Sequence, residues 1–330
     1  MQGGKVNKRA IVVAAAAMFT VALMPAKATA QAFPDKPIQM IIPFAPAGAS
    51  DVLGRILAKE LESRLGQPVV IVNKPGAGTV IGAQALLAAP ADGYSVLLSS
   101  NSTFALNPAV IGNLPYDSGK DFDALAQVAT IALAVVTYAD HPAKNIGDMI
   151  AAAKAAPDSV TLASFGNATT SHFAGEWLKS VAGIKMTHVA YKGSGPAMND
   201  LVGKHIPFLV DTVVASKPQI DAGRIRALAV TQSKRSAMIS DVPTLEETGI
   251  KGVDLTSWVA LVARKGIPAE AKARLMTALD SVMNDPGVIE RIQKAGFEVA
   301  YQKYADWPGR ITSETAAMKA IADKAGIKAE

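Results

Sequence analysis

The sequence predicts an α/β protein built as two lobes joined by crossing strands. Over most of the chain, short apolar runs alternate with amphipathic segments, a pattern typical of parallel sheets covered by helices on both faces. Two longer apolar runs, 125–138 and 255–263, divide the chain into thirds and predict strands that pass between lobes. We therefore expect residues 31–131 and 256–330 to form lobe 1 and residues 132–255 to form lobe 2. One large doubly wound sheet is the alternative.

The individual elements follow from this alternation and from the turn residues between the runs. Strands are predicted at 38–44, 69–73, 95–99, 125–138, 160–163, 186–190, 206–211, 225–231, 255–263 and 297–301. Helices are predicted at 50–65, 79–89, 146–156, 171–182, 243–248, 268–284, 288–295 and 307–324.

The first 30 residues have the pattern of an export signal. Lys5, Lys8 and Arg9 precede the apolar stretch 10–24, and small residues at 28–30 fit cleavage after Ala30. This stretch is shorter than the roughly 20 apolar residues that span a bilayer, which favours cleavage over a retained membrane anchor. We expect a periplasmic protein.

Charge and composition exclude several classes of partner and chemistry. The formal net charge of +5 falls to +1 without the four basic residues of the signal, and the only adjacent basic pairs that remain are Lys234–Arg235 and Arg264–Lys265. Nucleic-acid binding needs clustered basic residues, so we expect none. Cysteine is absent, which excludes disulfides, thiolate nucleophiles and cysteine metal sites.

The first loop has the pattern of half an anion site. An apolar run ends in the Pro/Gly loop 43–48, and Ser50–Asp51 then opens an amphipathic helix. A helix start leaves backbone N–H groups without partners, and the helix dipole favours negative charge there. The loop is therefore suited to a carboxylate or phosphate.

Other loops share this character. The segments 73–78, 99–103, 164–172 and 191–195 are rich in glycine or hydroxyl groups and each follows a predicted strand. Ligands of open α/β sheets bind beyond the carboxyl ends of the strands, where such loops meet. A single loop of this kind is an ordinary turn with a cap, but several in one chain indicate a polar ligand cleft.

Three charged residues near these loops each have two interpretations. Asp51 either interacts with the helix dipole or holds the ligand loop in place. Asp211 either binds an amino or hydroxyl group of a ligand or orders its neighbouring loop. Lys192 is either solvated or in contact with a ligand.

Nucleotide and enzyme motifs are not matched. Gly76, Gly78 and Gly82 have the wrong spacing for a dinucleotide fingerprint, and the phosphate-loop and nucleophile-elbow patterns are absent. A triad of Ser171, His172 and Asp211 is disfavoured because adjacent helical residues point about 100° apart. The four histidines have no metal-site spacing. We expect no catalytic residues, cofactor or metal.

Ten ordered motifs over the mature chain resemble the extracytoplasmic receptors of tripartite tricarboxylate transporters, the Bug proteins. They lie at 33–38, 43–51, 73–78, 91–94, 114–117, 166–167, 171–172, 191–194, 226–231 and 241–244. The resemblance implies a two-lobed periplasmic binding protein of the type II-like, Venus-flytrap class with strands crossing the hinge. It implies a receptor that captures a small mono- or dicarboxylate and delivers it to the membrane permease subunits. We expect a monomer.

The resemblance also implies which residues contact the ligand. Those of lobe 1 are Phe44, Ala45, Pro46, Ala47, Gly48, Asp51, Ser100, Asn101, Ser102 and Thr103. Those of lobe 2 are Thr169, Thr170, Ser171, Tyr191, Lys192 and Asp211.

Several positions depart from the family pattern. Ala47 and Ala168 stand where glycine is usual, and Thr79 stands where a second glycine often follows. A methyl group there narrows the approach of a ligand to the main chain. Phe165 replaces a common small residue and would either accommodate an aromatic ring or belong to the core.

Two other functions remain open at this point. One is a periplasmic ester hydrolase that uses Ser171, His172 and Asp211. The other is a ligand sensor that docks onto a histidine kinase.

Overall fold

The computed structural model describes residues 32–329. The predicted signal segment and its cleavage point after Ala30 lie outside the described residues. Among the helices that the structure describes, none is long and apolar enough to cross a membrane.

Lobe 1 is organised around a six-stranded sheet with strand order β11-β4-β10-β3-β1-β2. Its strands are β1 (Ile38–Ile42), β2 (Val69–Asn73), β3 (Ser95–Ser100), β4 (Phe122–Ile131), β10 (Ser257–Arg264) and β11 (Glu298–Gln302). Its helices are α2 (Ala49–Leu65), η1 (Ala77–Thr79), α3 (Val80–Ala88), η2 (Ser102–Leu106), α4 (Asn107–Val110), α9 (Ala269–Met283) and α10 (Pro286–Lys294).

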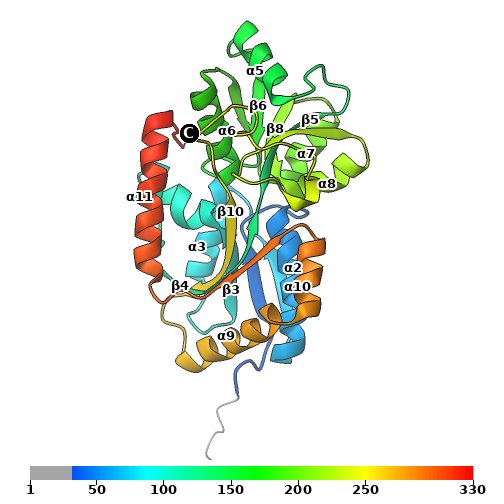
Figure 1. The fold of residues 1–330 in the computed structure, drawn as a ribbon. Coiled ribbons are helices and arrows are strands. Elements are labelled where there is room, and N and C mark those ends of the chain that lie inside the picture. The colour runs from blue at the N-terminus through cyan, green and yellow to red at the C-terminus, as the bar shows by residue number, and fades with distance from the viewer. Residues whose placement is uncertain (1–31, 330) are drawn as a thin grey trace, which may run out of the picture. The chain divides into compact units, whose positions relative to one another are not determined.

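Lobe 2 is organised around a five-stranded sheet with strand order β7-β6-β8-β5-β9. Its strands are β5 (Leu133–Tyr138), β6 (Thr161–Ser164), β7 (Thr187–Ala190), β8 (Phe208–Thr212) and β9 (Ile225–Val230). Its helices are α5 (Ile146–Ala155), α6 (Thr170–Ala182), α7 (Ser194–Val202), α8 (Val213–Asp221) and η3 (Ala237–Ile239). Figure 1 shows this lobe in green above the blue and cyan elements of lobe 1.

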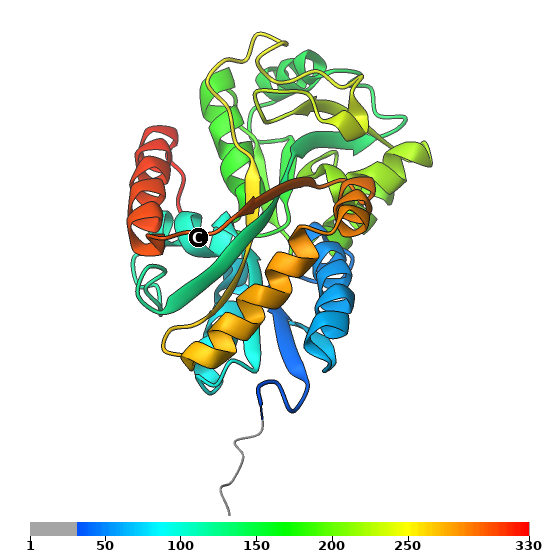
Figure 2. The same cartoon turned by 60° about the horizontal axis from the view of Figure 1, so that its bottom comes forward.

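The connection between the lobes corrects the prediction of one strand over 125–138. β4 ends at Ile131 in the first sheet, and β5 begins at Leu133 in the second, so the chain changes sheets at Ala132. The sheets are also mixed rather than wholly parallel, because β10 is antiparallel to β3 and β4, and β5 is antiparallel to β8 and β9. Figure 2 shows β4 and β10, which run in opposite directions, where they pass between the two lobes.

The predicted helix at 243–248 is wrong. Leu245 donates its N–H to Val230 O, and Val230 donates to Pro243 O, so this segment extends the edge of the second sheet. Gly249, with φ of +90°, ends the turn that follows.

The prediction missed α7 and α8. In α7 a Gly-Ser-Gly-Pro start obscures the helical spacing, and α8 contains Pro218, which normally interrupts a helix. Thr212 caps α8 by accepting a hydrogen bond from Ala215 N–H at 3.2 Å.

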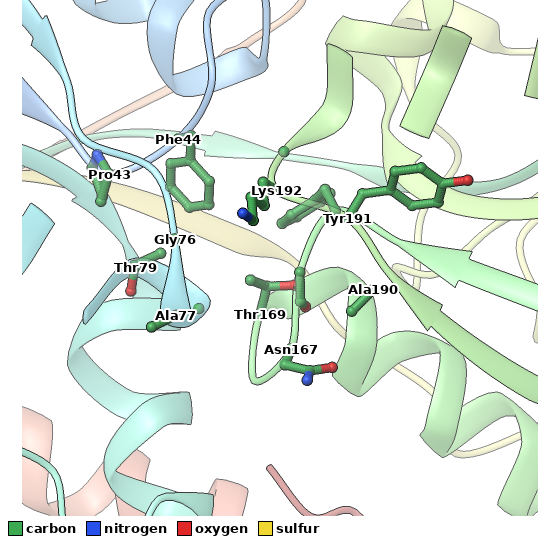
Figure 3. Close-up of a pocket in the computed structure, with 14 residues that line it drawn as sticks. Pro43, Phe44, Gly76, Ala77, Thr79, Asn167, Thr169, Ala190, Tyr191 and Lys192 are labelled. Carbon is green, nitrogen blue, oxygen red and sulfur yellow. The ribbon is translucent and has the colours of Figure 1, made fainter. Parts of the chain in front are cut away.

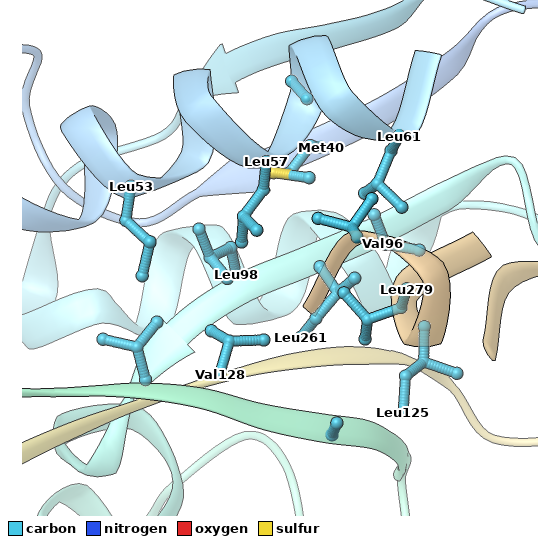
Figure 4. Packing of buried hydrophobic residues seen from close by; sticks show 14 of the residues in the cluster. Met40, Leu53, Leu57, Leu61, Val96, Leu98, Leu125, Val128, Leu261 and Leu279 are labelled. Atoms are coloured by element: carbon cyan, nitrogen blue, oxygen red, sulfur yellow. The ribbon is translucent and has the colours of Figure 1, made fainter. Parts of the chain in front are cut away.

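The core of lobe 1 explains why α2 forms where the sequence predicts it. Leu53, Leu57 and Leu61 recur on one face of α2 and are buried in the same core cluster as Met40 and Leu98 of the sheet (Figure 4). Burying each leucine stabilises the fold by about 2 kcal/mol. This packing holds the start of α2 against the carboxyl end of β1.

Helix α11 (Trp307–Ala325) contacts both lobes. Trp307 and Ile311 at its start are buried in a lobe 1 cluster with Phe104 and Trp258. Ala322 near its end, with Ile327 just beyond it, belongs to the core cluster of lobe 2. The red helix in Figure 1 therefore links the two cores along one side of the molecule.

Candidate functional site

A cavity of about 170 Å³ lies between the lobes, and we call it the interlobe cavity. Lobe 1 lines it with Pro43, Phe44 and 76–79, and lobe 2 lines it with 165–167, Thr169 and 190–193. Figure 3 shows Phe44, Ala77 and Thr79 on one side, facing Thr169 and Lys192 on the other.

Four strand-to-helix connections meet at or beside this cavity. They join β1 to α2, β2 to α3 through η1, β6 to α6, and β7 to α7. The N-cap residues of these helices are Gly48, Thr79, Thr169 and Gly193, and none of them caps its helix with a side-chain hydrogen bond. Backbone donors at these helix starts are therefore not occupied by the caps' own side chains.

The backbone at these starts includes unusual left-handed residues. Ala47, Ala77, Thr79 and Ala168 have φ between +46° and +88°, and only two other described non-glycine residues have positive φ. This conformation is costly for residues with a Cβ atom, most of all for a β-branched one. Strain of this kind is concentrated at functional sites.

The two lobes touch each other around the cavity. A Cβ atom added to Gly78 would overlap the carbonyl oxygen of Asn167, and one added to Gly193 would lie 2.7 Å from Ala45 Cβ. Pro46 O would lie 3.3 Å from a Cβ atom on Gly195. Glycine is thus required at Gly78 and Gly193, which also have positive φ, and it leaves space for the lobe contact at Gly195.

The expected ligand residues have different positions. Phe44, Thr169, Tyr191 and Lys192 line the interlobe cavity. The Tyr191 ring points away from it in Figure 3, and its hydroxyl donates to Asp200 Oδ2 at 2.6 Å.

Asp51 lies behind the first loop. Its carboxylate accepts hydrogen bonds from Arg55 Nε at 2.9 Å, Asn73 Nδ2 at 2.9 Å and Ala47 N at 3.1 Å. Burial favours a raised pKa for Asp51, but these hydrogen bonds outweigh it and lower the pKa. The carboxylate orders the loop 43–48.

The hydroxyl-rich loop of lobe 1 forms a buried cluster with lobe 2. Thr170 Oγ1 donates to Asn101 Oδ1 at 3.1 Å and lies 3.0 Å from Ser102 Oγ, which also accepts from Thr170 N–H at 3.0 Å. Thr103 Oγ1 donates to Thr79 Oγ1 at 2.7 Å. These side chains bind one another, and the structure does not bring Asn101, Ser102, Thr103 or Thr170 to the cavity wall.

A second, much smaller pocket of about 20 Å³ lies beside the cavity. Hydroxyl side chains dominate its polar lining, and we call it the hydroxyl pocket, defined by Ser50, Ser100, Ser194, Thr212 and Ser257. Gly48 also lines it.

The structure does not assemble Ser171, His172 and Asp211 into a triad. Ser171 Oγ donates to Val210 O, and His172 Nδ1 accepts from Ala168 N–H at 3.2 Å. Asp211 accepts from Ser194 Oγ at 2.7 Å, and burial raises its pKa to about 6. With its Nδ1 occupied by a backbone donor, His172 is not placed to take a proton from Ser171.

His172, Glu176 and His188 lie close enough to suggest a metal site, with one ligand atom of each within 4.8 Å of the others. The hydrogen bond from Ala168 N–H to His172 Nδ1 places the proton of a neutral ring on Nε2. The Nε2 that faces Glu176 then has no lone pair to offer. The histidines stack at 4.1 Å between ring centroids and support the loop 164–170 instead.

Several cavity residues are missing from the predicted list. Gly76, Ala77, Gly166, Ala190 and Gly193 contribute mainly backbone, and a search for hydroxyl or charged side chains passes over them. Their positions between a strand and a helix were the sequence signal that could have predicted them as cavity residues.

Comparison with known proteins identifies the family. The model of the tripartite tricarboxylate transporter family receptor matches residues 53–327. The chain belongs to this family. It is 35% identical over 322 residues to a UPF0065 protein of Cupriavidus necator, covering 97% of this chain and 96% of the relative.

Solved structures agree with the fold of this receptor. The periplasmic binding protein BugD matches it with a TM-score of 0.85 and 32% identity, covering 90% of this chain and 99% of BugD. R. palustris Rpa4515 with adipate matches with a TM-score of 0.85 and 29% identity, covering 90% of this chain and 99% of that one. The receptor thus has the two-lobed α/β fold of the periplasmic binding proteins.

Proposed function

We propose that the receptor captures a small mono- or dicarboxylate in the interlobe cavity. The observation that carries this proposal is the convergence of helix starts without side-chain caps on one cavity between two lobes. A carboxylate offers only acceptors, so it suits backbone N–H donors at the positive ends of helices. Rpa4515, a relative of similar fold, has been solved with adipate.

The cavity lining has one strong cation and no arginine. Lys192 is the only Lys or Arg among the lining residues, and Figure 3 shows it opposite Phe44. Recognition therefore depends on main-chain donors with Lys192, because the Thr169 hydroxyl already donates to Gly166 O, while Phe44 and Phe165 contact the hydrocarbon part of the acid.

The receptor releases its ligand unchanged. It is exported to the periplasm, loses residues 1–30 by cleavage after Ala30, and acts as a monomer. Ligand binding shifts an open–closed equilibrium toward the arrangement in which the lobes touch. The permease subunits of a tripartite tricarboxylate transporter recognise that closed arrangement.

Thermal denaturation with a panel of organic acids tests the ligand class. A ligand at 100 times its Kd raises the free energy of unfolding by about 2.7 kcal/mol. The panel contains aliphatic carboxylic acids, aromatic carboxylic acids and amino acids at millimolar concentration. We expect some of them to raise the Tm, whereas neutral sugars, the matched controls, should not. Stabilisation by sugars and by no carboxylate would contradict the proposal.

A pull-down with the permease subunits tests delivery. We expect retention of the receptor to increase with the acid that raises its Tm. Equal retention with and without that acid would separate binding from delivery and refute the delivery step.

A further inference from the structure

Phe44 and Phe165 together separate the two pockets between the lobes. Both side chains line the interlobe cavity of about 170 Å³, and both line the hydroxyl pocket of about 20 Å³. Their rings pack edge to face, with centroids 6.0 Å apart and planes at 84°. Phe44 comes from the first loop of lobe 1 and Phe165 from the end of β6 in lobe 2, so the two lobes build this partition jointly.

Phe165 is held more firmly than its partner. Its side chain is 7% exposed and belongs to the core cluster of lobe 2 with Leu162 and Phe173. Its backbone N–H donates to Ser171 Oγ at 3.3 Å, and Ser171 in turn donates to Val210 O in β8. An aromatic ring anchored in this way does not yield easily to a ligand atom.

The hydroxyl pocket behind the partition combines its five hydroxyl side chains with apolar walls and has room for about one water molecule. Ser194, on its wall, donates to Asp211 Oδ1 at 2.7 Å. Asp211 is fully buried, and its Oδ2 has no hydrogen-bond partner among the described residues. Groups that donate hydrogen bonds suit this surface, and a second carboxylate would be repelled by Asp211.

We propose that Phe165, packed against Phe44, closes the far end of the ligand cavity and sets the maximum length of the acid that the receptor accepts. The inference rests on the proposed function, because it assumes that the acid occupies the interlobe cavity. Without the phenyl ring of Phe165, the cavity continues into the hydroxyl pocket. Longer acids then fit. Acids that end in a hydroxyl group gain more affinity than acids that end in a second carboxylate.

Calorimetric titration of the purified protein with chain-length series tests this. The probes are straight-chain monocarboxylates, their ω-hydroxy derivatives and α,ω-dicarboxylates of about three to eight carbons; each newly buried methylene is worth about fourfold in Kd. We expect the wild type to bind short members and reject long ones. We expect Phe165→Ala to bind longer members, at least about tenfold more tightly than the wild type does.

Two further variants keep the test decisive. Phe165→Leu retains an apolar side chain and should fold even if Phe165→Ala does not, with a smaller extension of the length limit. Phe173→Leu makes the same change at a buried core phenylalanine that lines neither pocket and should leave the length limit unchanged.

The outcomes separate this inference from the function on which it rests. If the wild type binds none of the acids, the proposed function is wrong and the inference is wrong with it. If the wild type binds short acids but the Phe165 variants keep the same limit, only the inference is overturned. A wild type that binds long and short acids equally would also overturn it.

Discussion

Helices α2, α3, α6 and α7, which start around the interlobe cavity, begin differently from α5, α8, α10 and α11. The latter four are capped by the side chains of Asn145, Thr212, Asp285 and Asp306. The four helices around the cavity have no such cap. A capping side chain satisfies N–H donors that a ligand would otherwise use. The difference indicates that these helix starts leave backbone donors available for an anion, apart from Thr170 N–H, which donates to Ser102 Oγ.

Helix α9 also begins without a side-chain cap, at Pro268, but its first residues are exposed. Water can satisfy the backbone donors of an exposed helix start. The starts around the cavity differ because they lie between two lobes in contact, where residues such as Ser50, Thr79 and Thr170 are buried. Lack of a cap is therefore informative only where solvent access is restricted.

The largest expected effect comes from Gly78, at the start that leads into α3. Gly78→Ala places a methyl group against Asn167 O of lobe 2, so the lobes cannot close and binding should weaken by at least about 4 kcal/mol, or a thousandfold in Kd. Titration calorimetry with an acid that binds the wild type measures this.

Gly183→Ala is the matched control for Gly78→Ala. Gly183 has φ of +61°, close to the +59° of Gly78, and nothing lies within 4 Å of its added Cβ atom. It should lose about 1 kcal/mol of stability through backbone strain and keep its affinity. Equal losses of affinity in both variants would assign the effect to strain rather than to closure.

The next largest effect concerns the pH dependence of the start of α6. Burial and the charges nearby lower the pKa of His172 to about 3, and burial and Lys179 lower that of His188 to about 4. Unfolded histidine titrates near 6.5, so the unfolded state binds more protons and stability is lost as pH falls from about 6.5 to 4. Denaturant unfolding should show that the free energy of unfolding falls by about 3 kcal/mol over this range, after the opposing contribution of Asp211 is included.

Asp211 makes the opposite contribution to the pH dependence of stability between about pH 4 and 6. Its folded pKa of about 6 lies above the unfolded value of 3.8, so its contribution is lost as pH rises from about 4 to 6. The combined contribution of His172 and His188 to the change of stability with pH is larger than that of Asp211. Asp211→Asn should steepen the rise of stability with pH, whereas His172→Asn, whose side-chain oxygen can still accept from Ala168 N–H, should flatten it.

Much of the fold could be predicted because it depends on local periodicity. The leucines of α2 recur at helical spacing, and the apolar residues of β2 run together between turn residues. The change of sheets at Ala132 has no such signal, because an alanine inside an apolar run breaks no pattern. It is set by which sheet each half of the run joins.

The candidate site was predictable to the extent that its loops follow strands. The sequence could not predict which hydroxyl groups are available to a ligand. Their availability depends on hydrogen bonds to residues that are distant in sequence. Ser102 and Thr170 are 68 residues apart and bind each other, although each alone has the character of a ligand residue. Gly76 and Gly166 line the cavity through backbone, which side-chain chemistry does not reveal.

A carboxylate side chain introduced at the start of α6 should compete with the carboxylate of the ligand. Thr169 is the N-cap of α6 and lines the cavity, but its hydroxyl donates to Gly166 O instead of accepting from the helix. Thr169→Asp should weaken carboxylate binding by about tenfold or more, or about 1.4 kcal/mol. It should also raise the Tm of the ligand-free protein, because an aspartate cap stabilises a helix start.

Thr169→Asn separates capping from charge. Asparagine caps as well as aspartate but carries no charge, so its effect on affinity should be smaller. If both variants bind acids as tightly as the wild type, the start of α6 is not part of the ligand site.

The smallest expected effect tests the strain at the start of α2. Ala47 is exposed and has φ of +67°, so Ala47→Gly removes strain without losing buried surface. Glycine also makes the unfolded chain more flexible, which offsets part of the gain and leaves a rise of about 0.5 kcal/mol in the free energy of unfolding. Ala151→Gly, at an exposed position inside α5, should instead lose about 1 kcal/mol because its backbone is already relaxed. Opposite signs in denaturant titrations of these two variants would show that the receptor holds an alanine in a glycine conformation beside its cavity. Losses of equal size would mean that the first loop relaxes in solution and that its backbone is not held ready for the ligand.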